Sequence, residues 1–174
     1  SALTILPAAT IEAFPGILPL AVASSQSVLC MNYDGTYEAV ERQLRDSRVC
    51  CQPYRPVAEG VLAEATLLRL WEHLEAWRTA PPPSTTMLRV RCGVPPARLG
   101  EALALLTTPP AFAPQDVGWL AEAGSGQLYA RIALPLPELF PAATLAQRLQ
   151  GWLQALRGQL HTYQGYVVVE SAPA

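Results

Sequence analysis

Hydrophobic and polar positions after residue 86 follow two clear periods. Residues 87–92 alternate, with Leu88, Val90 and Cys92 on one face, which predicts a strand. The pair Pro95-Pro96 ends it and offers a helix start, and apolar residues then recur at helical spacing from Leu99 to Leu106. A strand followed by an amphipathic helix is therefore expected here.

The rest of this half continues the pattern. Residues 117–123 and 127–134 predict two strands around a turn at Gly124-Ser125, where glycine supplies a positive φ. Apolar residues from Leu145 to Leu160 predict a long helix, and residues 166–170 a final strand. The resulting order is β-α-β-β-α-β, which is ferredoxin-like.

The first half contains fewer clear signals. Residues 18–23 and 27–33 predict a hairpin, and helices are expected over residues 37–44 and 67–77. The proline-rich stretch 80–86 joins two sub-halves, 1–80 and 86–174, of one domain spanning 1–174. We expect an α+β fold in which both halves share one antiparallel sheet, with the helices on one face.

The predicted hairpin assigns side chains to the two sheet faces. Its register pairs Ala121 with Leu128, Trp119 with Ala130 and Val117 with Ile132, and this apolar set should lie under the helices. The other face is mixed and should meet water or a partner. It carries Arg89, Arg91, Tyr129 and Arg131.

The three arginines are the most informative polar group. Guanidinium groups gathered on one sheet face can clamp a carboxylate through paired hydrogen bonds. The alternative is a solvated or salt-bridged face, with Glu122 and Glu170 as the counter-charges.

Composition narrows the function classes. Of 174 residues, 51% are hydrophobic and only 15% charged, so part of the surface is expected to meet another protein or domain. The net charge is −2 and no basic stripe occurs, which argues against nucleic-acid binding. No apolar run reaches the roughly 18 residues typical of a membrane span.

Catalytic and metal-binding signatures do not stand out. The four cysteines form no CxxC pair, so we expect no metal site and interpret Cys30 and Cys92 as buried reduced thiols of a cytoplasmic protein. Neither histidine is paired with a nucleophile in a known signature, and we assign no catalytic residue. The glycines at 124 and 126 lie between two strands, unlike a phosphate loop.

Three short motifs resemble the C-terminal part of FAD-linked oxidases, such as the E subunit of glycolate oxidase. They are WLAEAGSGQLYARI from Trp119, QGYVVVESAP from Gln164 and RCGVPP from Arg91. The family pattern has Gly-Gly where this chain has Gln164-Gly165. The resemblance extends over most of the chain, but each motif is short.

The resemblance implies a cap domain that covers a flavin and shapes the substrate pocket. The intact protein would be an FAD-dependent oxidoreductase of 2-hydroxy acids such as glycolate, and this chain would be inactive alone. FAD is implied only for the full-length protein, because this chain has no counterpart of the family's FAD-binding domain. Partners would be an FAD-binding domain and other glycolate oxidase-type subunits. The face that carries Arg89, Arg91, Tyr129 and Arg131 would be turned toward the flavin or substrate. Among these four, Arg91 has the strongest assignment, because it lies in a matching motif.

The chain begins Ser1-Ala2-Leu3, and we interpret this start as the cut edge of a fragment or a processed chain. The mixed face, left bare, would pair with a second copy or form a large patch. A stand-alone ferredoxin-like module for small-ligand binding or dimerisation is the alternative. A small independent enzyme is disfavoured by the lack of a catalytic set.

Overall fold

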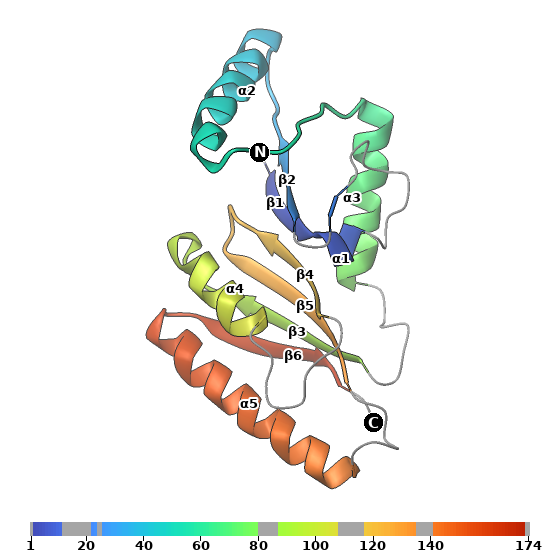
Figure 1. The fold of residues 1–174 in the computed structure, drawn as a ribbon, viewed down its shortest axis with the longest axis vertical. Coiled ribbons are helices and arrows are strands. Elements are labelled where there is room, and N and C mark those ends of the chain that lie inside the picture. Colours follow the sequence, from blue (N-terminus) through green and yellow to red (C-terminus); the bar gives the residue numbers. More distant parts are fainter. Residues whose placement is uncertain are drawn as a thin grey trace.

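The structure is a computed structural model, and it describes residues 2–11, 22–23, 26–79, 87–107, 117–134 and 141–172 (Figure 1). The fold is α+β. Its strands are β1 (Ala2–Pro7), β2 (Ser27–Asn32), β3 (Met87–Gly93), β4 (Val117–Glu122), β5 (Gln127–Ala133) and β6 (Tyr166–Ser171). Its α-helices are α1 (Ala8–Ile11), α2 (Tyr37–Cys51), α3 (Glu64–Thr79), α4 (Leu99–Thr107) and α5 (Ala142–Thr162).

The described strands form one antiparallel sheet in the order β2-β1-β4-β5-β3-β6. The expectation that both halves of the chain contribute to one antiparallel sheet is confirmed. Strand β1 was not expected from the pattern, and it joins the two halves by pairing with β2 on one side and β4 on the other. The strand predicted at 18–23 lies mostly outside the described residues, and Val22 and Ala23 are not in a strand.

The β4–β5 hairpin has the predicted register, with Ala121 opposite Leu128 and Trp119 opposite Ala130. The turn differs in detail. The residue with positive φ is Gly126 (φ +70°), whose N–H donates to the carbonyl of Glu122. A Cβ at Gly126 would lie 1.9 Å from the Val94 carbonyl oxygen, so packing against the end of β3 also requires glycine there.

One face of the sheet forms the main core under α4 and α5. The predicted apolar set lies there, and Leu128, Ala121 and Leu160 are fully buried. Helices α4 and α5 contribute leucines at helical spacing, including Leu99, Leu106 and Leu156. Alternate residues of each strand point to this side. The apolar residues of the strands therefore pack against the apolar stripes of α4 and α5 in one layer.

The expectation that the helices lie on one face is wrong, because α3 packs on the opposite face. Leu70, Leu74 and Trp77 of α3 form a second core with Leu6 and Leu120. A Cβ added at Gly118 would lie 3.3 Å from the Trp77 ring, so the bare glycine permits close contact. Leu6 and Leu120 give this face an apolar area that only a helix from the first half covers.

The cysteines are reduced and differ in burial. Cys92 in β3 is buried, Cys30 in β2 is half-buried and Cys50 is exposed. Burial raises the pKa of Cys92 to about 12 and that of Cys30 to about 11, because the thiolate loses hydration. The expectation of buried thiols is therefore confirmed for Cys92 and holds in part for Cys30.

The proline-rich stretch expected to join the sub-halves, 80–86, lies outside the described residues. Helix α2 contains no buried residue, and Figure 1 shows it beyond the end of the sheet. Among the helices that the structure describes, none is both long enough and apolar enough to cross a membrane.

Candidate functional site

The four residues singled out in the sequence lie on the mixed face of the sheet. In the β3–β5 register Arg89 stands opposite Arg131, and Arg91 stands opposite Tyr129. Two like charges directly opposite each other are unfavourable unless each finds its own acceptor. The two arginines do so by reaching different parts of the molecule.

Arg131 points under helix α3. Its guanidinium lies 4.8 Å from the centre of the Trp77 ring and donates a hydrogen bond to the Trp77 carbonyl. Burial, with the nearby charge of Arg89, lowers the pKa of Arg131. A cation at the last carbonyls of a helix also faces the negative end of its dipole. Arg131 thus holds α3 on the sheet.

Arg89 also reaches the end of α3. Its guanidinium donates to the carbonyls of Arg78 and Thr79, the latter at 3.3 Å. It forms an ion pair with Glu170 of β6 at 2.8 Å. One side chain therefore joins the end of α3, its own strand β3 and the edge strand β6.

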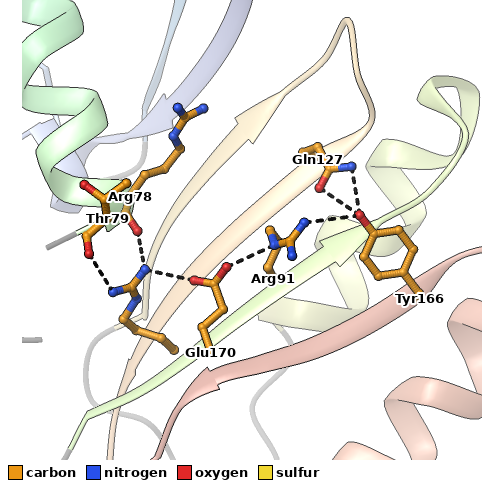
Figure 2. A network of polar contacts seen from close by, with 7 residues as sticks. Arg78, Thr79, Arg91, Gln127, Tyr166 and Glu170 are labelled. Atoms are coloured by element: carbon orange, nitrogen blue, oxygen red, sulfur yellow. Dashed lines mark hydrogen bonds and ion pairs between the residues drawn. The ribbon is translucent and has the colours of Figure 1, made fainter. Parts of the chain in front are cut away.

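Glu170 bridges the two arginines of β3. Its other oxygen accepts from Nε of Arg91 at 3.0 Å, and Figure 2 shows the carboxylate beside the Arg91 side chain. The β3–β6 register shifts between Arg89 and Val90, so two β6 residues oppose one β3 residue beside this ion pair. Of the two counter-charges considered in the sequence, Glu170 pairs with the sheet arginines.

Glu122 does not pair with the sheet arginines in any contact that the structure describes. It forms an ion pair with Arg78 of α3, which also pairs with Glu75. Burial alone would lower the pKa of Arg78, but the hydrogen bond to Glu75 and the charge of Glu122 raise it overall. Arg78 lies 5.4 Å from the centre of the Tyr129 ring.

Tyr166 extends the network along β6. Its hydroxyl exchanges hydrogen bonds of 3.0 and 3.1 Å with the Gln127 amide and accepts from Arg91 at 3.5 Å (Figure 2). A Cβ at Gly93 would clash with the Tyr166 ring, so the ring lies directly over this glycine. Arg91 is therefore held from both sides, by Glu170 and by Tyr166.

These side chains border an open groove of about 490 Å³. It is lined by Glu75, Arg78, Thr79, Arg89, Arg91, Tyr129 and Glu170. Arg78 is paired with two carboxylates, Glu75 and Glu122, whereas Arg89 and Arg91 share the single carboxylate of Glu170. Burial first, and then the charge of Glu122, raises the pKa of Tyr129, so its hydroxyl stays a hydrogen-bond donor. This arrangement can hold a small anion with hydrogen-bonding substituents.

The structure brings Arg89, Arg91 and Tyr129 together in this groove, whereas Arg131 lies under α3. Sequence reasoning missed the contribution of α3: Glu75, Arg78 and Thr79. All three lie on the polar side of an amphipathic helix, and such positions usually face water. Only the position of α3 on the sheet assigns them to the groove.

A comparison with protein-family models finds no match to this sequence, and a comparison with curated proteins also finds none. The resemblance to FAD-linked oxidases therefore depends on the short motifs, and the function assigned from it stays a prediction.

Proposed function

We propose that this chain is the C-terminal cap domain of an FAD-dependent oxidoreductase that acts on 2-hydroxy acids such as glycolate. The element order β3-α4-β4-β5-α5-β6 supports a ferredoxin-like core, to which β1 and β2 add two strands at one edge. Such a fold serves many functions, so the proposal depends on the groove and the motifs.

The observation that carries the proposal is the paired arginines on the open part of the mixed face. Arg89 and Arg91 already hold one carboxylate, that of Glu170, through hydrogen bonds of 2.8 and 3.0 Å. A ligand carboxylate has the same chemistry and would bind beside or in place of Glu170. Two guanidinium groups share this one carboxylate, which favours the binding of a monoanion beside it.

The described residues do not fit FAD by themselves. The glycine turn at 124–126 connects β4 to β5, so its amides do not converge with a helix N-terminus on a pyrophosphate. When bound to its own domain, FAD would accept the hydride from the hydroxy acid. The part assigned to this chain is to bind and orient the acid through Arg89, Arg91 and Tyr129.

The proposal is tested by replacing Arg91. We expect Arg91→Gln to weaken glycolate binding about tenfold or more, since a charge-assisted hydrogen bond is lost. The matched control is Arg157→Gln, on the exposed side of α5. Titration of the purified chain by NMR measures both, and equal affinities in the two variants would refute the carboxylate site.

Two further observations distinguish the cap-domain hypothesis from the alternative of a stand-alone ligand-binding module. We expect the purified chain to be colourless, and flavin absorbance would contradict its role as a cap without its own cofactor. The coding sequence around this segment should encode an FAD-binding domain. A frame without one favours the independent ligand-binding module, whose groove is formed by the same residues.

A further inference from the structure

A second cavity adjoins the groove on the same face of the sheet. Its volume is about 230 Å³, and it lies between α3 and the strands β1 and β4. Its apolar lining comes from Trp71, Leu74 and Leu120, with the buried Thr4 beside them. Glu75 and Arg78 line both cavities, so the two spaces share one wall.

The indole of Trp71 supplies the aromatic part of the cavity lining. Its Nε1 is buried and has no hydrogen-bond partner among the described residues. Because that atom has almost no accessible surface, the part of the indole that a ligand in the cavity can contact is its carbon ring. The Trp71 pocket therefore has apolar walls from Trp71, Leu74 and Leu120, and its charged residues, Glu75, Arg78 and Glu122, are paired with one another.

The shared wall is itself polar and movable. Arg78 is ion-paired with Glu75 and Glu122 and lies over the Tyr129 ring. Long side chains of this kind change rotamer more easily than the leucines of a packed core. A change in the Arg78 rotamer would break these ion pairs and connect the two spaces without moving a strand of the sheet.

We propose that the Trp71 pocket receives the side chain of the acid whose carboxylate binds in the groove, so that the preferred ligand is an aryl-substituted 2-hydroxy acid. This inference rests on the proposed function. Size supports it, because a dry cavity of about 150 Å³ holds benzene and this one is larger. Glycolate has no side chain to bury there.

The test uses three ligands and the purified chain. They are 3-phenyllactate, glycolate, and 3-phenylpropane-1,2-diol, which has the ring and hydroxyl of phenyllactate but no carboxylate. We expect phenyllactate to bind about tenfold or more tightly than glycolate, because its ring is buried. We also expect it to bind more tightly than the diol, which lacks the ion pair. NMR titration gives each Kd.

Tryptophan fluorescence locates the bound ring. Phenyllactate should change the emission of the unmodified chain, and Trp71→Phe should remove most of that change. Trp152→Phe is the matched control, because Trp152 packs on the α5 side of the sheet and should leave the response intact. A response that survives in Trp71→Phe overturns the placement of the ring.

The ligand series separates the two proposals. Equal affinity for phenyllactate and glycolate overturns the Trp71 pocket and leaves the arginine groove in place. Equal affinity for phenyllactate and the diol overturns the carboxylate site and leaves the pocket. Absence of saturable binding into the millimolar range overturns both.

Discussion

The two faces of the sheet are closed in different ways. On the α4–α5 face, β3, β4, β5 and β6 all contribute apolar side chains, and the result is a continuous core. On the α3 face, the buried apolar residues of the strands are Leu6 of β1 and Leu120 of β4, with the half-buried Cys30 and Tyr129 beside them. The β3–β6 part of that face carries arginines and Glu170 around an open groove.

This difference separates apolar packing from directed polar contacts within one sheet. The α4–α5 face depends on apolar burial, which any well-packed leucine set supplies. The α3 face depends on a few directed contacts, chiefly Arg89 and Arg131 at the last carbonyls of α3. Arg89 both holds the helix end and lines the groove, as do Arg78 and Thr79 of α3, so docking of α3 and formation of the groove are coupled.

The largest expected loss of stability comes from a substitution in the continuous core of the α4–α5 face. Leu128→Ala removes a fully buried side chain and should lower the free energy of unfolding by about 2–5 kcal/mol. Urea denaturation measures it. The control Leu68→Ala, on the exposed side of α3, should change stability by less than about 0.5 kcal/mol. Similar losses in both variants would contradict the assigned core.

The next largest loss of stability is expected from a substitution in the turn that joins β4 to β5. Gly126→Ala forces an L-residue into φ +70° and places Cβ against the Val94 carbonyl, so we expect a loss of about 1–3 kcal/mol. Gly124→Ala is the matched control, since a Cβ there meets open space. The thermal midpoints of the two variants should differ, and the prediction fails if Gly124→Ala is the more damaging.

A smaller effect tests the attachment of α3. Arg131→Met keeps the aliphatic stem but loses the hydrogen bond to the Trp77 carbonyl and the contact with its ring. We expect a loss of about 1–2 kcal/mol in urea denaturation. Arg157→Met, on exposed α5, should cost little. Near-ultraviolet circular dichroism should also report the changed surroundings of Trp77, and an unchanged signal would argue against this contact.

The smallest effect concerns the thiols. The pKa of Cys92 is raised to about 12 and that of Cys30 to about 11, above the ordinary 9.0. Their contribution to stability is complete below pH 9.0 and is lost as pH rises through the folded pKa values, because the unfolded thiols ionise first. Alkylation at pH 8 should modify Cys50 first. Rapid modification of Cys92 in the folded chain would contradict its burial.

The second half of the fold was predictable because its signals are local. Leu88, Val90 and Cys92 alternate within one strand, and the β4–β5 turn brings Ala121 opposite Leu128 without information from elsewhere. Strand β1 was missed because Leu3 to Leu6 form a short run with no clear alternation. The structure explains this, since both Leu6 and Thr4 are buried under the first half while Ile5 packs on the opposite core.

The candidate site was predictable only in part. Alternation alone assigns Arg89, Arg91 and Tyr129 to one face, and Glu170 was among the expected counter-charges. The sequence did not separate Arg131 from this set, because its contact with Trp77 joins positions 54 residues apart. For the same reason the pairing of Glu122 with Arg78 was not foreseen.

By itself, the amino-acid order determined which side chains share a face of each strand and helix in the second half, since these periods are properties of the local backbone. Only the tertiary structure decided that α3 lies on the mixed face, that its last carbonyls meet Arg89 and Arg131, and that a groove remains beside them. The physical reason is that a helix with one apolar stripe can cover any matching apolar area. The choice among such areas is made by contacts between residues far apart in the chain.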